Sequence, residues 1–340
     1  MRPLRFGIIG CSRIAQRSVI PAILKSEFAD IEMIGSRTEE KARDFSIKFN
    51  CDRSGTYDDI ILDENVDVVY ISTPIGTHEE FAIKAAESGK HVYCEKSSTV
   101  SYQSAKKMTA VCKENNVRIL EGFMFRYHPQ HQKVNELIKN NRIGKPITFN
   151  GKFGFPKFPE GDIRYDKELG GGFLNDSGCY PICASRMIFG EEPVGVSCSL
   201  IIDEKTGVDV RGTSHMIFTD EKTASLTYGN GSYYQSEYEI WGTEGTILLD
   251  RAYSVPPDFQ TNVRLTFDIK PSWDGKRQEK FEIQKSDHFL EMIDVFCHEI
   301  NLKEDSEMDF EMELQNQAKV MEAHRISSQE KRFVNINEID

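Results

Sequence analysis

The segment "GIIGCSRIA", residues 7–15, decides the fold of the first part of the chain. It joins a short apolar run, typical of a buried strand, to a pattern of apolar residues at helical spacing. In dinucleotide-binding proteins this junction carries the fingerprint G-x-G-x-x-G. The chain has Gly10, Ser12 and Ala15 at the three glycine positions, so two of the three glycines are replaced.

Each replacement preserves part of the fingerprint's chemistry. Gly10 permits the tight turn, Ser12 is small, and Ala15 still allows the helix to pack closely on the strand. The N–H groups at the start of the helix, where Arg13 and Ile14 lie, would then face a pyrophosphate. These residues alone leave two readings open, a cofactor loop or a strand–helix turn without a ligand.

Strand-like and helix-like patterns alternate through the first 125 residues. The expected strands are 4–10, 30–36, 66–73, 90–96 and 117–123, and the expected helices are 14–26, 39–49, 78–89 and 102–116. Such alternation predicts a doubly wound parallel sheet of Rossmann type with helices on both faces.

The pattern changes after about residue 125. Helices are expected at 131–141, 182–190, 288–300 and 311–327, a Gly- and Pro-rich passage at 144–178, and alternating strands between about 194 and 284, including 214–220, 236–243 and 264–270. The fold class predicted is therefore α/β, with an N-terminal Rossmann domain and a C-terminal α+β domain that has an open, mainly antiparallel sheet. We expect a dinucleotide-binding domain at 1–125 and a substrate-binding and oligomerisation domain at 126–340. An alternative for the helix at 311–327 is that it packs back on the first domain.

Composition excludes several classes of protein. The 340 residues carry a net charge of −12, which provides no basic surface for nucleic acid. No apolar run approaches the roughly 20 residues that span a bilayer. Arg2 and Arg5 lead directly into the first strand, so we expect no signal peptide. The eight cysteines are scattered, and the C-x-x-x-C of Cys179 and Cys183 is weak support for zinc. We therefore expect a cytoplasmic protein with reduced thiols, no metal, no nucleic-acid partner and no membrane partner.

The end of the second expected strand bears on the choice of cofactor. Proteins that prefer NAD place Asp or Glu there to bind the ribose 2′-hydroxyl. This chain has Ser36 and Arg37, which suit a 2′-phosphate. The pair favours NADP(H), with NAD(H) still possible, although Arg37 is also explained as a surface arginine.

The segment "STPIGTHEEFAIKAAESGKHVYCEK" (72–96) resembles the Gfo/Idh/MocA oxidoreductase family, whose members carry T-P-x-x-x-H, A-x-x-A-x-x-x-G-K-H-V and E-K-P in this order. The segment "EGFMFRYHPQH" (121–131) resembles the family's exit from the cofactor domain. The segment "DIRYDKELGGGFLNDSGCYPICASRMIFG" (162–190) resembles the start of its second domain. Several separate motifs in family order make the resemblance specific, and the strands after about residue 194 add little to that specificity.

The resemblance implies roles for residues of the first domain. Cofactor contacts are implied at Thr73, Pro74, His78, Glu95 and Lys96. Lys96 is expected at the nicotinamide, near the substrate oxygen. Ser97 replaces the family's proline, and a cis peptide costs about 2.5–4 kcal/mol before a residue other than proline. The Lys96–Ser97 bond is therefore either trans or held cis by its surroundings.

The resemblance also points to residues of the second domain. Many family members have Asp-x-x-x-His where this chain has Asp176-x-x-x-Tyr180. A tyrosine there resembles the sugar 3-ketoreductases that act on nucleotide-linked deoxysugars, and the aldose and dihydrodiol dehydrogenases. Arg126 and Arg164 join Asp176 and Tyr180 as candidate substrate-binding residues.

These residue types suit hydride transfer to or from a carbohydrate. Reduction of a ketone leaves negative charge on its oxygen, which a proton donor must meet. Tyr180 is assigned as the general acid, Lys96 as its electrostatic partner and second donor, and Asp176 as a residue that orients the lysine or a sugar hydroxyl. We expect an NAD(P)-dependent oxidoreductase acting on CH–OH groups, with a sugar or nucleotide sugar as substrate. The alternatives are a free-sugar or trans-diol dehydrogenase, and a non-catalytic sensor of the dinucleotide.

The second sheet also predicts assembly. A sheet covered by helices on one face leaves its other face to be covered. Aromatic residues gather on the expected strands between 224 and 241, namely Tyr228, Tyr233, Tyr234, Tyr238 and Trp241. We expect them to cover the faces of the sheet and to form an interface in a homodimer or homotetramer.

Overall fold

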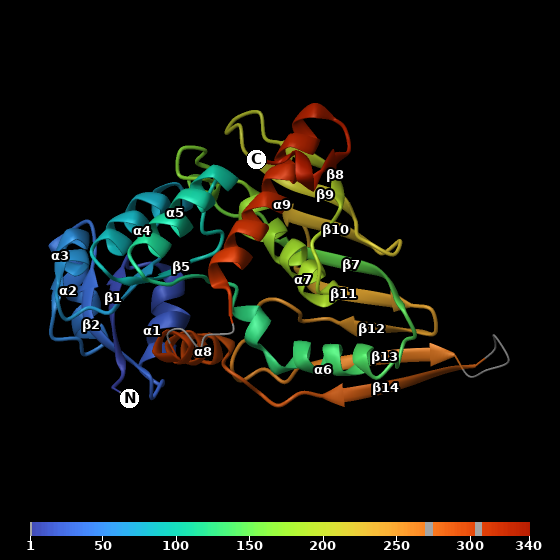
Figure 1. Cartoon of the computed structure of the whole chain (residues 1–340), viewed down its shortest axis with the longest axis horizontal. Helices are drawn as coiled ribbons and strands as arrows, with labels where there is room; N and C mark the ends of the chain where they lie inside the picture. The colour runs from blue at the N-terminus through green and yellow to red at the C-terminus, as the bar shows by residue number, and fades with distance from the viewer. Residues whose placement is uncertain (1, 269–274, 303–307) are drawn as a thin grey trace. The chain divides into compact units, whose positions relative to one another are not determined.

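The computed structural model of the chain describes residues 2–268, 275–302 and 308–340 (Figure 1). The chain forms two compact units. The first contains Met1–Met124 and Phe289–Ala318, and the second contains Phe125–His288 and Lys319–Asp340. The helix expected at 311–327 is α9, Phe310–Glu330, whose first turns up to Ala318 belong to the first unit.

The first unit is built on a parallel sheet. Its six strands are β1 Leu4–Ile9, β2 Ala29–Gly35, β3 Ser54–Gly55, β4 Val68–Ile71, β5 His91–Cys94 and β6 Ile119–Glu121. They lie in the order β3-β2-β1-β4-β5-β6, and every neighbouring pair is parallel. The predicted doubly wound sheet is therefore confirmed. The strand order reverses between β1 and β4, and such a reversal opens a crevice at the carboxyl ends of the strands.

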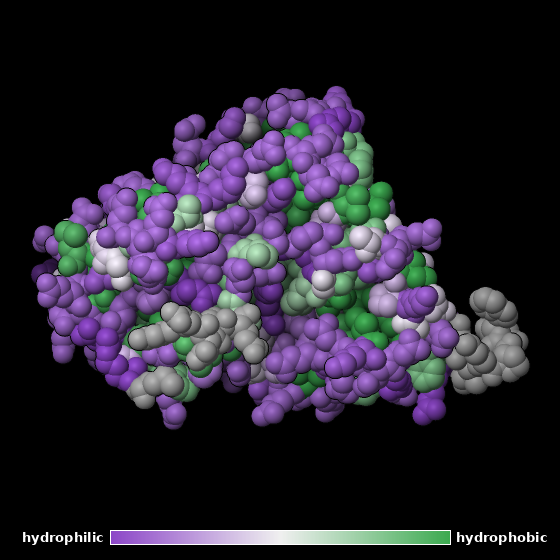
Figure 2. Space-filling view, in the orientation of Figure 1, coloured by the Kyte–Doolittle hydropathy of each residue, from purple (hydrophilic) through white to green (hydrophobic). Residues whose placement is uncertain are grey.

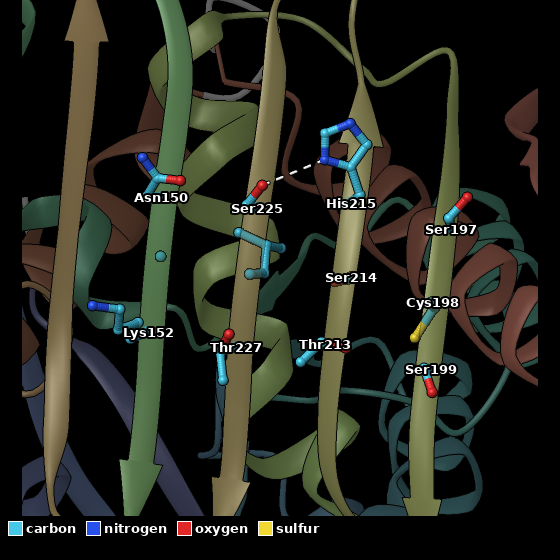
Figure 3. A pocket seen from close by; sticks show the side chains of 12 residues that line it. Asn150, Lys152, Ser197, Cys198, Ser199, Thr213, Ser214, His215, Ser225 and Thr227 are labelled. Carbon is cyan, nitrogen blue, oxygen red and sulfur yellow. Dashed lines mark hydrogen bonds between the residues drawn. The ribbon is translucent and has the colours of Figure 1, made fainter.

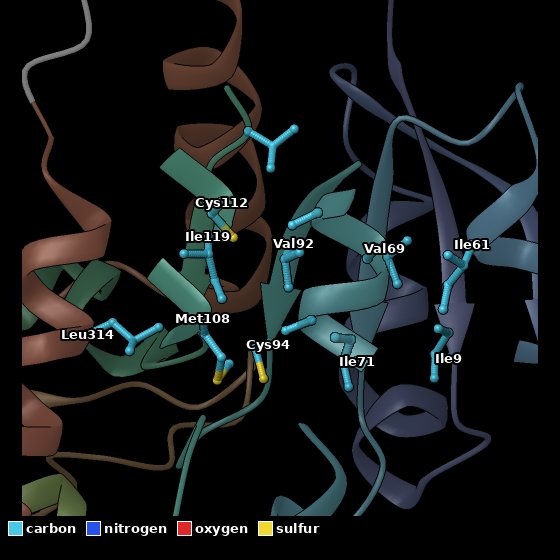
Figure 4. Packing of buried hydrophobic residues seen from close by; sticks show 14 of the residues in the cluster. Ile9, Ile61, Val69, Ile71, Val92, Cys94, Met108, Cys112, Ile119 and Leu314 are labelled. Atoms are coloured by element: carbon cyan, nitrogen blue, oxygen red, sulfur yellow. The ribbon is translucent and has the colours of Figure 1, made fainter. Parts of the chain in front are cut away.

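Helices and an apolar core support this sheet. The helices are the π-helical turn Ala15–Val19 continued by α1 Ile20–Ile23, then α2 Glu39–Lys48, α3 Tyr57–Leu62, α4 His78–Glu87, α5 Tyr102–Glu114 and α8 His288–Leu302. Figure 4 shows one buried cluster, in which Ile71 and Val92 of the sheet pack with Met108 of α5 and Leu314 of α9. Burial of each such side chain contributes about 1.5–3 kcal/mol to stability. The two-residue strand β3 and the short helix α3 were not predicted, because neither is long enough to show a periodicity.

The second unit is built on a nine-stranded sheet. Its strands are β7 Pro146–Phe155, β8 Gly195–Ile202, β9 Asp209–Ile217, β10 Thr223–Asn230, β11 Gln235–Gly242, β12 Gly245–Leu249, β13 Asn262–Asp268, β14 Lys276–Glu282 and β15 Val334–Asn335. The order is β14-β13-β12-β11-β7-β10-β9-β8-β15, and β7 and β10 pair in parallel whereas the other pairs are antiparallel. The predicted mainly antiparallel sheet is confirmed. Residues 269 and 270 of the strand expected at 264–270 lie outside the described residues.

Strand β7 lies in the passage where the sequence predicted no strand. Its inward side chains alternate, with Phe149 and Phe153 buried, but Gly151 takes the inward position between them. A Cβ on Gly151 would lie 2.8 Å from the Cβ of Pro181. The glycine therefore lets a helix approach the strand, and it also interrupts the apolar pattern that would have predicted the strand.

Helices cover one face of this sheet, and no helix in the described parts of the chain covers the other, which is called the bare face below. The covering helices are α6 Pro129–Lys139, α7 Cys179–Phe189, which is preceded by the π-helical turn Leu174–Gly178, and the part of α9 after Ala318, which bonds to β8. Figure 3 shows the bare face, with α7 behind the sheet and polar side chains in front of it. Tyr228 and Tyr238 are buried on the helix side, so the expectation that they cover an interface was wrong. Their positions alternate with outward residues, and Trp241, 53% exposed, is one of the outward ones.

The surface is predominantly polar. Hydrophilic residues cover most of the face drawn in Figure 2, in keeping with the charged fraction of 28%. In the parts of the chain that the structure describes, no helix combines the length and apolar character needed to cross a bilayer.

Three buried histidines brace the second unit. The rings of His128 and His288 lie 5.8 Å apart. His131 accepts a hydrogen bond from the Tyr238 hydroxyl at Nδ1 (2.8 Å) and donates one from Nε2 to the Ala252 carbonyl (3.1 Å). Burial lowers the pKa of His128 to about 4 and those of His131 and His288 to about 3. The three imidazoles are therefore neutral structural groups at neutral pH.

These histidines predict a loss of stability in acid. In the unfolded chain a histidine has a pKa of about 6.5, so between pH 6.5 and about 4 the unfolded chain binds protons that the folded chain does not. The free energy of unfolding should fall with falling pH by about 1.4 kcal/mol per pH unit for each histidine. His128→Asn keeps an acceptor for the Gln130 N–H, which His128 Nδ1 accepts at 3.2 Å, and removes one titrating group. Urea unfolding at several pH values should give a slope smaller by about 1.4 kcal/mol per pH unit, and an unchanged slope would contradict the assignment.

Candidate functional site

The turn after β1 requires glycine at position 10. Gly10 has a φ of +100°, and its N–H donates to the Gly35 carbonyl at 3.2 Å. The Ser72 hydroxyl donates to the Gly10 carbonyl at 2.8 Å, and a Cβ on Gly10 would lie 3.0 Å from that hydroxyl. The turn is thus fixed from both neighbouring strands and has no room for a side chain on its inner side.

Ser12 acts as the cap of the first helix. Its hydroxyl accepts the Ala15 N–H at 3.1 Å. As a hydroxyl it retains one O–H that can donate to an anion. Arg13 is exposed and Ile14 is partly buried at the first turn, where helical N–H groups have no acceptor within the helix. An open turn, a donor hydroxyl and unsatisfied N–H groups together fit a pyrophosphate.

Lys41 of α2 is a basic residue near the end of β2 that was not predicted as part of the site. Ser36 is buried and Arg37 is exposed. The Cys11 thiol lies 3.7 Å from the Gly35 carbonyl and 3.9 Å from the Lys41 carbonyl of α2. Burial raises the pKa of the Cys11 thiol, and the positive charge of Lys41 opposes this rise. The Lys41 charge therefore acts on the turn after β1, where Cys11 lies. The feature of the sequence that could have indicated this residue is a lysine in the first turn of the second expected helix, close to the expected site of a 2′-phosphate.

The loop after β4 is held by a buried histidine. His78 donates from Nε2 to the Thr73 carbonyl at 2.7 Å. Burial lowers its pKa to about 4, so the ring is neutral. The Thr77 hydroxyl lies 2.8 Å from both the Thr73 hydroxyl and the Pro74 carbonyl. His78 is 1% exposed, and the structure gives it the role of holding Thr73 and Pro74 at the edge of the sheet.

Glu95 and Lys96 follow β5 at the same edge. Glu95 is buried and accepts the Tyr70 hydroxyl at 2.9 Å. Burial raises the pKa of Glu95 to about 7, against the opposing effects of Tyr70 and Lys96. Lys96 is partly buried, and the Lys96–Ser97 peptide is cis. At this edge of the sheet Glu95 is therefore the buried residue, and the neighbouring Lys96 is the partly exposed one.

The candidates of the second unit gather around α7. Arg164 donates from Nε to Asp176 Oδ2 at 2.8 Å and from Nη1 to Asp162 Oδ1 at 3.0 Å. Tyr180 is 6% exposed, on the first turn of α7. The Arg126 guanidinium lies 3.9 Å from the thiol of Cys183, one turn further along the helix.

An aromatic cluster holds Tyr180. Its ring centroid lies 4.8 Å from that of Phe153, 5.7 Å from that of Phe125 and 5.9 Å from that of Tyr253. Such contacts fix the plane of the phenol ring. Tyr180 is therefore held rigidly within the second unit.

Comparison with known families gives two matches that together span most of the chain. Residues 4–123 match the Gfo/Idh/MocA profile described as "Oxidoreductase family, NAD-binding Rossmann fold". Residues 131–248 match the "GFO/IDH/MocA C-terminal domain".

Individual relatives are similar along most of their length. A dTDP-3,4-didehydro-2,6-dideoxy-alpha-D-glucose 3-reductase from Saccharopolyspora spinosa is 33% identical over 78% of this chain and 80% of its own. A D-xylose 1-dehydrogenase (NADP(+)) from Haloferax volcanii is 31% identical over 75% of this chain and 78% of its own. The crystal structure of a 3-ketoreductase from Actinomadura kijaniata, in complex with NADP and TDP-benzene, matches with a TM-score of 0.89 and 30% identity, covering 96% of this chain and 98% of that one.

Arg37, which follows β2, and Lys41 of α2 predict the choice of cofactor. If Arg37 and Lys41 meet a 2′-phosphate, Lys41→Met and Arg37→Asp should each raise the Kd for NADPH about 10- to 100-fold, because a hydrogen bond to a charged group contributes about 1.5–3 kcal/mol. The Kd for NADH should change less than about threefold, since NADH lacks the phosphate. Lys48→Met, on the same helix, is the control and should change neither value. Nicotinamide fluorescence measures both constants, and equal losses for the two cofactors would remove these residues from the site.

Proposed function

The chain belongs to the Gfo/Idh/MocA oxidoreductase family, and from this premise we propose that it is an NADP(H)-dependent sugar 3-ketoreductase that interconverts a ketone and a hydroxyl on a nucleotide-linked deoxysugar. The observation that carries the proposal is the residue pair Lys96 and Tyr180, one at the end of β5 and the other on the first turn of α7. A sensor of the dinucleotide has no need of a positioned proton donor.

The relatives support this choice of substrate. The Saccharopolyspora spinosa relative is named as a reductase of a dTDP-linked dideoxysugar. The Actinomadura kijaniata 3-ketoreductase was also solved as one variant with a tyrosine replaced by phenylalanine and another with a lysine replaced by alanine. Those two residues stand 84 positions apart in that protein, as Lys96 and Tyr180 do here.

The first unit would hold the cofactor through residues from successive strand ends. Gly10, Ser12 and the first helical turn, with Arg13 and Ile14, would hold the pyrophosphate. Ser36, Arg37 and Lys41 would hold the 2′-phosphate, while Thr73 and Pro74 line the dinucleotide and His78 and Glu95 support the loops. When bound, the nicotinamide supplies or accepts the hydride.

The proton moves through residues of this chain. An ordinary tyrosine has a pKa near 10 and an ordinary lysine near 10.4, so both side chains carry their protons at neutral pH. In reduction, the Tyr180 hydroxyl would give its proton to the ketone oxygen while the Lys96 ammonium donates a hydrogen bond to the same oxygen. Asp176, held by Arg164, would orient a sugar hydroxyl, and Arg126 would contact the substrate. In oxidation the lysine charge would help the phenol lose its proton.

A second function has one specific observation in its favour. The Haloferax volcanii relative is named as an NADP-dependent dehydrogenase of a free sugar. Turnover of D-xylose without turnover of any dTDP-linked ketosugar would favour that function. Turnover of neither, with NADPH still bound, would favour the sensor.

The bare face of the second sheet supports a homodimer or homotetramer. Polar side chains line a shallow hollow on it, from Asn150 and Lys152 of β7 to Ser225, His215 and Ser197 on the strands beside it (Figure 3). The exposed Trp241 stands on the same outward side of the sheet and would add apolar area to such an interface. All eight cysteines are thiols rather than disulfides, which supports the cytoplasmic location.

Turnover by single variants tests the chemistry. Tyr180→Phe removes one hydroxyl and keeps the ring, and Lys96→Met removes the charge and keeps most of the stem. Loss of a positioned acid typically costs about 10²- to 10⁴-fold, so each variant should lose kcat by that order while the Kd for NADPH changes little. The double variant should lose less than the product of the two, because both groups act on one oxygen. Wild-type turnover by Tyr180→Phe would refute its role as the acid.

Light scattering tests the assembly. The wild-type protein should be a dimer or tetramer at micromolar concentration. Ser225→Arg places a long charged side chain in the middle of the bare face, where Ser225 now lies 3.4 Å from His215 Nδ1, and should shift the protein to monomer. Lys205→Glu, on the turn between β8 and β9, should leave assembly unchanged. A wild-type monomer would rule the interface out.

A further inference from the structure

The helical segment that carries Asp176 and Tyr180 begins without a cap of its own. It runs through the π-helical turn Leu174–Gly178 into α7. Phe173 occupies the N-cap position, and its side chain accepts no hydrogen bond. The first N–H groups of a helix need acceptors from outside it, and a missing cap costs about 0.5–2 kcal/mol.

A residue from a distant strand supplies the missing acceptor. The Leu174 N–H donates to Asp209 Oδ2 at 2.5 Å, across 35 positions of sequence. A carboxylate at a helix N-terminus also interacts favourably with the helix dipole. Asp209, the first residue of β9, therefore does for this helix what Ser12 does for the first helix of the chain.

A β-bulge turns Asp209 toward the helix. Leu200 pairs with Gly212 and Ile201 with Arg211, but Ile202 pairs with Asp209, so Val210 is an extra residue in β9. Without the bulge, Asp209 would share the outward face with Arg211, because alternate residues of a strand share a face. With it, Asp209 lies on the side of Gly212, which faces the buried Tyr228. Bulges characteristically re-aim a side chain in this way.

A glycine leaves room for the carboxylate. Gly172 has a φ of +114°, and a Cβ there would lie 2.3 Å from Asp209 Oδ1. The position therefore excludes a side chain for two reasons, its backbone conformation and the carboxylate itself. The third glycine of the run 170–172 thus has a defined structural purpose.

A second bond holds the next residue of the same turn. Arg325 of α9 donates to Asn175 Oδ1 at 2.6 Å, and Asn175 donates to the Gly170 carbonyl at 3.1 Å. The Arg325 charge also acts on the Asp209 carboxylate. Leu174 and Asn175, the two residues before Asp176, are thus fixed from two different elements.

We propose that Asp209 is a positioning residue of the enzyme: by capping the helix at Leu174, it holds the turn on which Asp176 and Tyr180 stand. The proposal rests on the function proposed above for those two residues. A group misplaced by about 1 Å can cost about 10²-fold in rate, so the loss of the cap should reach the chemistry.

Three variants and one control test the proposal. Asp209→Ala removes the acceptor, and Asp209→Asn keeps an oxygen that can accept the Leu174 N–H. Gly172→Ala places a methyl group where the carboxylate lies and also strains the backbone at a φ of +114°. The control is Ser327→Ala in the same unit, because Ser327 also accepts a backbone N–H, that of Cys198 at 2.8 Å, but does not touch this helix. Hydrogen exchange of residues 173–180, kcat, and KM for NADPH are measured for each.

Asp209→Ala and Gly172→Ala should both speed amide exchange in 173–180 and lower kcat about 10- to 100-fold, with KM for NADPH changed less than about twofold. Asp209→Asn should retain kcat within about threefold of the wild type, and Ser327→Ala should alter neither exchange in 173–180 nor kcat. Unchanged exchange or unchanged kcat in Asp209→Ala would overturn the proposal, as would an Asp209→Asn variant as impaired as Asp209→Ala. If the wild type turned over no sugar, the proposed function would fail, while exchange would still decide whether Asp209 holds the turn.

Discussion

The parallel pairing of β1, β4 and β5 is the constraint on which the cofactor candidates depend. Parallel strands end at one edge, so the residues after each strand meet there although they are far apart in sequence. Hydrogen bonds between strand ends make that edge rigid: Ser72 after β4 holds Gly10 after β1, and the backbone N–H of Glu95 donates to Ile71 at 3.0 Å. Of the buried polar groups near this edge, His78 holds the loop after β4 through the Thr73 carbonyl, and Glu95 accepts the Tyr70 hydroxyl of β4.

The helix starts at Ser12 and at Leu174 show opposite uses of one physical fact. Each presents N–H groups that attract negative charge. In the first unit Ser12 satisfies one of them, which leaves the remainder of the turn to an anionic ligand. In the second unit Asp209 brings a carboxylate from within the protein, so the helix start is occupied by the chain itself. One helix start therefore suits phosphate, whereas the other suits the fixed placement of side chains two and six residues further on.

Sequence predicted the features that depend on local pattern and missed those that depend on distant contacts. The strands ending at Ile9, Ile71 and Cys94 gave apolar runs long enough to read. Strand β7 was missed because Gly151 interrupts its apolar pattern. The glycine is there because helix α7 packs closely against the strand, and this contact cannot be inferred from the strand's own residues. Asp209 was missed for the same reason, since its role depends on a bulge in β9 and on a turn 35 positions away. Lys41 could have been predicted from the sequence, because the helix expected at 39–49 follows the second strand and places Lys41 in its first turn.

The ion pairs of Arg164 limit what that residue can recognise. Its guanidinium is held by Asp162 and Asp176 and lies 4.3 Å from the Phe158 ring. One positive charge between two carboxylates leaves a net negative cluster, which repels a diphosphate at short range. Arg164 therefore fixes the carboxylate of Asp176 in one orientation.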